Sequence, residues 1–198
     1  MENAVVLCMM MKKYNYQQII LLSPPRRYDS AIFKSDLKNG RFKIQNKEYG
    51  GIKPEKGLWT STYEPFMIKK VFVSEWHEWC FSDMPDWIGR ECILLTVMNT
   101  AKIFTIDTYE DLKELYKKYP AVKISSNGWG QYEVSKGGFQ DNCLDFEKMK
   151  KDFDILWLTS NGQSETRMSH QLNLYGWDSE SSLMLNNVVQ TFKKVPTY

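Results

Sequence analysis

Two segments of the chain bring hydroxyl, aromatic and acidic side chains together at spacings that could support chemistry. The first, Gly57–Tyr63, reads Gly-Leu-Trp-Thr-Ser-Thr-Tyr. Because side chains alternate along a strand, Trp59, Ser61 and Tyr63 would share one face, an aromatic wall with a hydroxyl between the rings. The opposite face would carry Thr60 and Thr62.

The second segment, Tyr175–Ser182, adds acidic groups and reads Tyr-Gly-Trp-Asp-Ser-Glu-Ser-Ser. On a strand, Asp178, Glu180 and Ser182 would lie on one face. This segment therefore offers two carboxylates beside a hydroxyl as candidates for catalysis.

The motifs of several well-known binding sites are absent from the sequence. The chain has no Gly-x-Gly-x-x-Gly and no Gly-x4-Gly-Lys-Ser/Thr, so neither a Rossmann site nor a P-loop is indicated. Its four cysteines form no Cys-x-x-Cys pair, and with only His77 and His170 no zinc-ligand spacing arises, so we expect no metal. His77 lies among tryptophans and is interpreted as a packed helix residue, not a general base.

Composition predicts one intracellular domain over residues 1–198, with reduced cysteines and a cytoplasmic location. Apolar residues make up 42% and charged residues 25%, as in globular proteins. The apolar run at 4–11 is too short to cross a membrane and has no basic segment before it. Residues 1–70 hold 13 Lys/Arg against 6 Asp/Glu, a net charge of +7, which is compatible with a polyanionic ligand or with a solvated basic face.

Strand and helix patterns alternate irregularly along the chain. Strands are expected at 18–22, 57–63, 93–97, 102–106, 121–125, 154–159, within 175–185 and at 188–192; helices are expected at 75–81, 109–119 and 144–152, with Ser74 and Thr108 as N-caps. Residues 93–97 and 102–106 should pair as a hairpin, and 34–55 and 160–173 should be loops. Hairpin-like strands with segregated helices favour an α+β fold with a split mixed or antiparallel sheet.

The ordered segments resemble the arginine–serine–glutamate class of ADP-ribosyltransferases, which includes bacterial and phage toxin-like enzymes. That family shows an early arginine, then a Ser-Thr-Ser-like strand, then a late Glu-x-Glu or Gln-x-Glu. The corresponding positions are Arg26 or Arg27, Thr60–Thr62, and Asp178 with Glu180. Asp178 departs from the family, which carries Glu or Gln there.

The resemblance implies an ADP-ribosyltransferase-like fold, NAD as co-substrate and no metal. Glu180 would stabilise the oxocarbenium-like centre formed when the nicotinamide–ribose bond breaks, with Ser61 supporting it and Asp178 aligning the acceptor. Arg26 or Arg27 would pair with the NAD phosphates, and Trp59 or Tyr63 would wall the nicotinamide, next to Thr60 and Thr62. A toxin or antiphage-defence role and an antitoxin partner are implied by the resemblance alone.

Three functions remain open at the level of sequence. The first is transfer of ADP-ribose to a macromolecule, with RNA slightly favoured over protein because the N-terminal part is basic. The second is an NAD-dependent RNA 2′-phosphotransferase, which relies on basic residues in place of the late glutamate. The third is a non-catalytic nucleic-acid binding module, whose salt-dependent binding would survive loss of Glu180.

Overall fold

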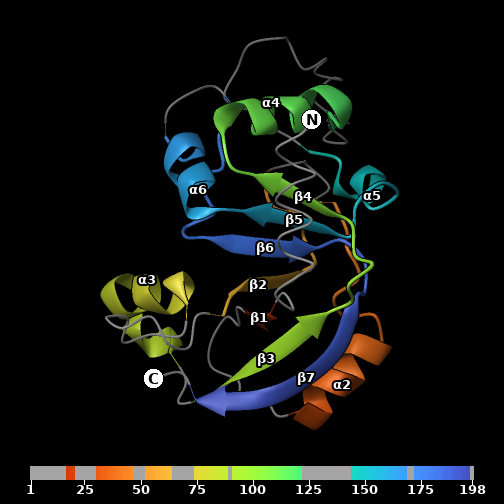
Figure 1. Ribbon diagram of the computed structural model, residues 1–198, viewed down its shortest axis with the longest axis vertical. Helices are drawn as coiled ribbons and strands as arrows, with labels where there is room; N and C mark the ends of the chain where they lie inside the picture. Colours follow the sequence, from red (N-terminus) through yellow and green to blue (C-terminus); the bar gives the residue numbers. More distant parts are fainter. Residues whose placement is uncertain are drawn as a thin grey trace, which may run out of the picture.

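Seven strands of the described residues form one mixed sheet in the order β4-β5-β6-β2-β1-β3-β7 (Figure 1). This computed structural model describes residues 17–20, 30–46, 52–63, 74–88, 91–121, 144–168 and 172–196. The strands are β1 Gln17–Ile20, β2 Leu58–Thr62, β3 Glu91–Val97, β4 Ile103–Ile106, β5 Ile155–Leu158, β6 Ser181–Met184 and β7 Val189–Pro196. The β4–β5 pair is parallel and the other pairs are antiparallel. The predicted α+β class with a mixed sheet is confirmed.

The helices lie around this sheet, and their starts follow local capping chemistry. They are α2 Ser30–Lys38, α3 Glu75–Asp83, the 3-10 helix η1 Pro85–Trp87, α4 Tyr109–Lys118, α5 Phe146–Met149 and α6 Ser160–Thr166. The side chain of Ser74 accepts a hydrogen bond from the His77 N–H, and Thr108 forms a capping box with Asp111. Both predicted N-caps are confirmed.

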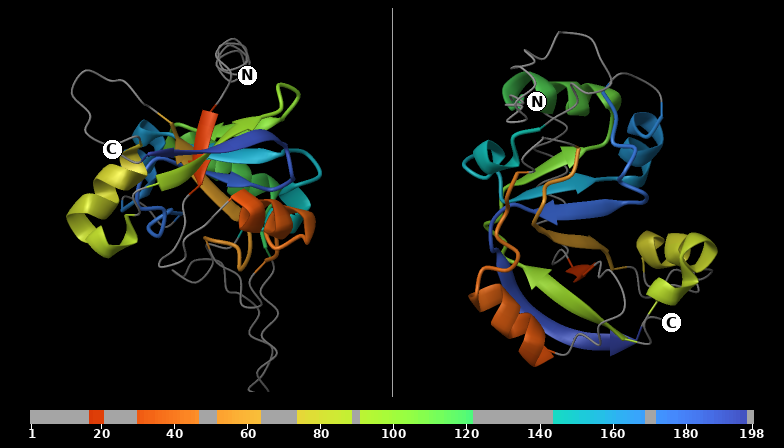
Figure 2. Two further views of the ribbon diagram at one scale, coloured as in Figure 1. Left: turned by 90° about the horizontal axis from the view of Figure 1, so that it is seen from below. Right: turned by 180° about the vertical axis from the view of Figure 1, so that it is seen from behind.

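The helices divide between the two ends of the central strands. Helices α3 and α6 lie at one end of β2 and β6, while α5 and α2 lie at the other (Figure 1). The two views in Figure 2 agree that α3 and α2 lie on opposite sides of the molecule. None of the helices in the described ranges is long and apolar enough to cross a bilayer.

The predicted hairpin between 93–97 and 102–106 is wrong. Strand β3 pairs with β1 and β7, whereas β4 lies at the far edge of the sheet and pairs in parallel with β5. The chain does turn here, since the Ala101 N–H donates to the Met98 carbonyl at 3.0 Å. After the turn, Lys102 exchanges hydrogen bonds with Asp154, which directs the chain toward β5. A long-range partner therefore overrides the local turn signal.

Two segments expected as loops contain helices. Helix α2 occupies part of 34–55 because Phe33 is fully buried, with its ring 4.9 Å from that of Phe192. Helix α6 has an entirely polar sequence and is capped by Thr159. Its Gly162 packs so tightly on β4 that an added Cβ would lie 2.0 Å from the Ile106 carbonyl oxygen. Tertiary packing, not periodicity, stabilises both helices.

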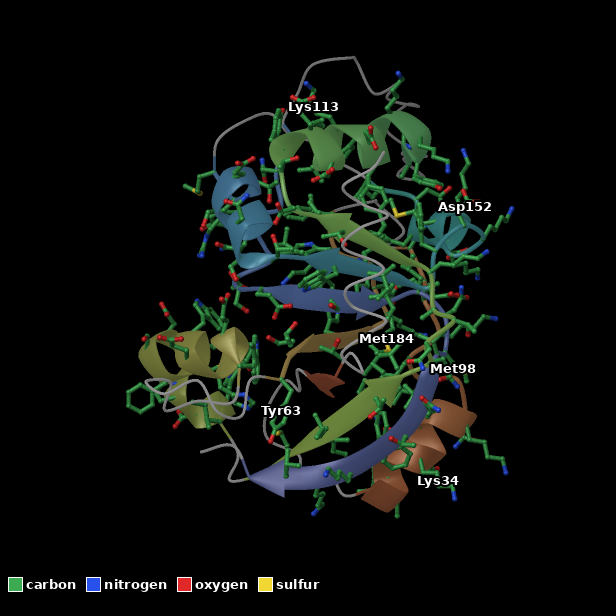
Figure 3. All side chains as sticks on the ribbon, in the orientation of Figure 1. Lys34, Tyr63, Met98, Lys113, Asp152 and Met184 are labelled. Atoms are coloured by element: carbon green, nitrogen blue, oxygen red, sulfur yellow. The ribbon has the colours of Figure 1, made fainter. Side chains whose placement is uncertain are left out.

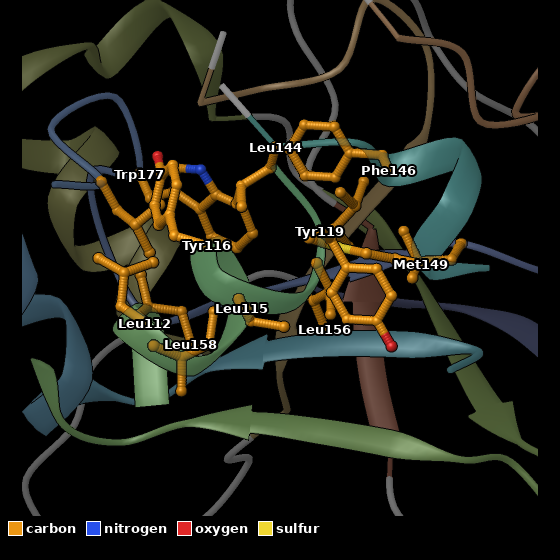
Figure 4. Packing of buried hydrophobic residues seen from close by; sticks show 14 of the residues in the cluster. Leu112, Leu115, Tyr116, Tyr119, Leu144, Phe146, Met149, Leu156, Leu158 and Trp177 are labelled. Carbon is orange, nitrogen blue, oxygen red and sulfur yellow. The ribbon is translucent and has the colours of Figure 1, made fainter. Parts of the chain in front are cut away.

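Apolar side chains cover both faces of the sheet. One face carries α4 and α5, whose buried residues pack on β5 and Trp177 (Figure 4). The other face carries the α2 residue Phe33, packed with a cluster that includes Ile93 and Leu95. Strand β5 contributes Leu156 to the first cluster and Ile155 to the second, as strand alternation requires. The central strands are thus anchored on both sides.

Candidate active site

Glu180 lies immediately before β6 and is 5% exposed, yet its carboxylate accepts four hydrogen bonds. Oε2 accepts from the Ser61 hydroxyl at 2.7 Å and from the Thr62 backbone N–H at 2.9 Å. Oε1 accepts from the Thr62 hydroxyl at 2.7 Å and from the Trp157 indole N–H at 2.5 Å. The structure therefore brings Ser61, Thr62 and Glu180 together, as the sequence order suggested, and adds Trp157.

The donors are distributed so that only an acidic side chain fits this position. Each carboxylate oxygen receives one hydroxyl, which can rotate, and one N–H, which cannot turn into an acceptor. A glutamine would place its NH₂ group against either the Thr62 N–H or the Trp157 N–H. A carboxylate has about four acceptor positions, so a ligand hydroxyl would have to displace one of these donors.

The charge of Glu180 has no cationic partner among the described residues. The salt bridges formed there involve other carboxylates. Burial raises the pKa of Glu180, while the hydrogen bonds from Ser61, Thr62 and Trp157 act in the opposite direction. Neutral donors therefore hold this buried acid, and no described cation forms an ion pair with it. Ionisable groups in such settings are concentrated at functional sites.

The site forms where the β2–β6 ladder ends. The paired residues run from Leu58 opposite Met184 to Thr60 opposite Ser182. Beyond them, the Thr62 N–H donates to the side chain of Glu180 in place of a strand carbonyl. Buried hydroxyls surround this point: Ser61 and Ser179 both donate to the Glu180 carbonyl at 3.2 Å. The end of an otherwise ordinary strand pair thus becomes a buried polar cluster around one carboxylate.

Asp178 lies at the exposed edge of the same site. Its side chain is 35% exposed, with carboxylate oxygens 3.9 Å from the Lys53 ammonium and 3.9 Å from the Arg167 guanidinium. Its backbone carbonyl accepts hydrogen bonds from Gln163 and Arg167 of the α6 region. Because β6 begins at Ser181, Asp178 and Glu180 lie before the strand, and strand alternation does not decide where their side chains point. The prediction that Asp178, Glu180 and Ser182 share one face of a strand is wrong. We refer to Asp178, Lys53 and Arg167 as the rim.

The predicted aromatic wall is not formed as one surface. Trp59 packs edge-on against Trp177, with ring centroids 4.6 Å apart, and the Lys53 ammonium lies 5.5 Å from its ring. Tyr63 instead packs with Cys92 and Leu94, because it follows the last residue of β2. The two rings belong to separate clusters.

Three predicted site residues remain: Thr60, which is buried, and Arg26 and Arg27. Thr60 is fully buried, and its hydroxyl donates to the Ser182 carbonyl at 3.5 Å, so it packs inside the sheet. Arg26 and Arg27 lie outside the described residues. Among the described residues, the cations beside the site are Lys53 and Arg167 of the rim. Neither of them was identified from the sequence.

Helix α3 lies at the same end of β2 and β6 as the site (Figure 1). Glu75 of α3 accepts a hydrogen bond from the Ser160 hydroxyl of α6 at 2.5 Å, which ties the two helices together. His77 is buried, contacts the Ser74 hydroxyl through Nδ1 at 3.0 Å, and has its pKa lowered to about 4 by burial. It is therefore a neutral, packed helix residue, which confirms the sequence interpretation.

Trp157 was missed because an aromatic residue inside an apolar strand looks like core. Its role emerges only from the pairing of β5 with β6, which places Trp157 opposite Ser182 and two residues from Glu180. Within the ranges that the structure describes, no three His, Cys, Asp or Glu side chains are grouped so as to hold a metal ion.

Comparison with family models, with curated proteins and with solved structures gives no match for this chain. The site itself has three features that bear on function: the buried carboxylate, the hydroxyls around it and the charged rim.

Proposed function

We propose that this protein is an ADP-ribosyltransferase that takes NAD as co-substrate and transfers ADP-ribose to a macromolecule. The observation that supports this is the Glu180 carboxylate, which is buried, is oriented by Ser61, Thr62 and Trp157, and has no ion-pair partner in the part of the chain that the structure describes. A negative charge fixed in a poorly solvated place is most effective when positive charge develops beside it.

The proposed reaction creates such a charge. The bond between the nicotinamide nitrogen and the ribose anomeric carbon breaks, its electron pair leaves with nicotinamide, and the ribose becomes oxocarbenium-like. Glu180 stabilises this centre through its charge, because its acceptor positions are already occupied. The acceptor nucleophile then bonds to the anomeric carbon and releases its proton to solvent. Asp178, partly exposed at the rim, is suited to orient that nucleophile.

The charged residues around the site influence which macromolecule could accept ADP-ribose. Helix α3 and η1 carry Glu75, Glu78, Asp83 and Asp86 with no lysine or arginine between them. These carboxylates disfavour a nucleic-acid strand crossing α3, whereas Lys53 and Arg167 at the rim favour the pyrophosphate of NAD. The acceptor class, RNA or protein, is therefore a question for the first experiment.

That experiment incubates labelled NAD with separate RNA, DNA and protein pools and compares wild type with Glu180→Gln. The substitution removes the charge at nearly constant size, and we expect label transfer to fall about 10²–10³-fold, the usual cost of losing one preorganised electrostatic contact. Glu78→Gln, which neutralises an exposed carboxylate of α3, serves as the matched control and should retain activity.

Stability must be measured in parallel. Because glutamine leaves one N–H facing an NH₂ group, Glu180→Gln should cost about 1–3 kcal/mol, a fall in melting temperature of roughly 2–10 °C. If the folded variant transfers label as fast as wild type, Glu180 is structural and the proposed function fails. Binding of nucleic acid without NAD consumption would instead support the binding module.

A further inference from the structure

The described residues line an open pocket of about 260 Å³ at the end of β2 and β6 remote from Glu180. Leu58 and Met184, which pair at that end, lie in its wall. Figure 3 labels Tyr63 and Met184 at opposite ends of this strand pair. The pocket is therefore separate from the candidate active site, and an inference about it does not depend on the proposed function.

The wall of the pocket is mainly aliphatic. Its apolar side chains are Leu37, Phe42, Ile44, Leu58, Met184 and Leu185. Small-molecule sites typically measure about 300–1,000 Å³ and are lined by apolar groups with a few polar ones, so this pocket is of a size for a short chain. One aromatic ring among branched and flexible aliphatic groups favours an aliphatic ligand over a flat one.

Two lysines give the lining its charge. Lys43 and Lys150 line the pocket, and the lining contains no carboxylate. Within the part of the chain that the structure describes, neither ammonium group forms an ion pair or a side-chain hydrogen bond. Positive charge beside an apolar wall is complementary to a ligand that is apolar at one end and anionic at the other.

The segments that carry these lysines are held in place by specific bonds. Helix α2 ends with Gly40 in the left-handed region at φ 69°, where the Arg41 N–H donates to the Asp36 carbonyl at 3.0 Å. This directs the chain toward Lys43. The side-chain amide of Asn186 donates to the Lys150 carbonyl at 2.8 Å and to the Asp154 carboxylate at 2.9 Å. These bonds fix the two backbone segments that carry Lys43 and Lys150 beside the pocket.

We propose that this pocket binds a small amphipathic carboxylate. The aliphatic chain contacts Leu58 and Met184, and the carboxylate lies on the side of Lys43 and Lys150. A nucleotide is a poorer fit, because one phenylalanine offers little surface for a base.

Octanoate is the probe, and the methyl group of Met184 reports on it. Protein labelled with ¹³C at methionine methyls is titrated with octanoate and followed by NMR, with Met184→Leu used for assignment. We expect a saturable shift at Met184 and none at Met168, which is 75% exposed. Octylammonium, with the same chain and the opposite charge, should not reproduce the shift, and acetate should have no effect.

Matched lysine variants test the charged side. Lys43→Gln and Lys150→Gln should each weaken octanoate about threefold to fivefold, as expected for partly exposed ion pairs. Lys151→Gln, the neighbouring lysine that does not line the pocket, should leave the affinity unchanged. The proposal is overturned if Met184 does not respond, if octylammonium binds equally well, or if Lys151→Gln weakens binding as much as Lys150→Gln.

Discussion

The two ends of the β2–β6 strand pair differ in what they bury. At one end, Leu58 and Met184 lie among aliphatic side chains beside a pocket. At the other, three and four residues further along β2, Ser61 and Thr62 hold the Glu180 carboxylate. The same backbone ladder therefore changes from apolar packing to a hydrogen-bonded acid within one short strand.

This difference gives the two ends different expected roles: the Leu58 end stabilises the sheet, and the Glu180 end carries the proposed chemistry. Apolar burial at the Leu58 end stabilises the sheet without an ionisable group, whereas the Glu180 end buries an acid that costs free energy to ionise. The cost is tolerated because the apolar end anchors the strands. Changes at the two ends should consequently have different signatures.

The largest effect is expected from Leu58→Ala. Removing this buried side chain should destabilise the protein by about 2–5 kcal/mol, measured by urea unfolding, without changing the proposed NAD cleavage per folded molecule. Ile32→Ala, at an exposed position of α2, is the control and should cost less than about 0.5 kcal/mol. A loss of NAD cleavage in folded Leu58→Ala would show that the two ends are not independent.

A smaller effect is expected from Trp157→Phe, which keeps an aromatic ring but removes the N–H donated to Glu180. Losing a hydrogen bond to a charged acceptor should cost about 1–3 kcal/mol and raise the pKa of Glu180 further. Carboxyl ¹³C NMR measures that pKa directly. Trp79→Phe is the control, since the indole of Trp79 has no acceptor among the described residues; an unchanged Glu180 pKa in Trp157→Phe would contradict the assigned contact.

The smallest signal is a pH dependence of stability. Because burial raises the pKa of Glu180 above its ordinary value of 4.5, the folded protein holds this proton at pH values where the unfolded chain has lost it. Its contribution to stability is therefore full below pH 4.5 and is lost as the pH rises through the raised pKa. The difference in unfolding free energy between wild type and Glu180→Gln should fall across that window; a difference that rises with pH would show that the pKa is lowered instead.

Local signals in the sequence predicted part of the fold. Ser74 and Thr108 cap helices as expected, and β2 and β5 lie within the predicted strands. The pairing of β4 with β5 could not be read from the turn at 99–100, because register and partners depend on contacts far apart in sequence. Helix α6, polar throughout, has no periodic signal at all.

The candidate site could be predicted only where the sequence resembles the motifs of ADP-ribosyltransferases. The contact between Ser61 and Glu180 follows from the resemblance and from the order of the two segments. Three other contacts depend on how segments distant in sequence are arranged, which no single segment encodes. They are the hydrogen bonds to Glu180 from the Trp157 indole and the Thr62 N–H, and the bond from Arg167 to the Asp178 carbonyl. The role of Arg26 or Arg27 stays a prediction.

The close contact of Gly162 with the Ile106 carbonyl limits which sequences this site can tolerate. Any side chain at position 162 would push α6 away from β4, and with it Gln163 and Arg167, whose hydrogen bonds hold the Asp178 backbone. The absence of a side chain at Gly162 thereby helps to fix the position of the rim. Position 162 should be among the least substitutable in the chain, although its residue takes no part in the chemistry.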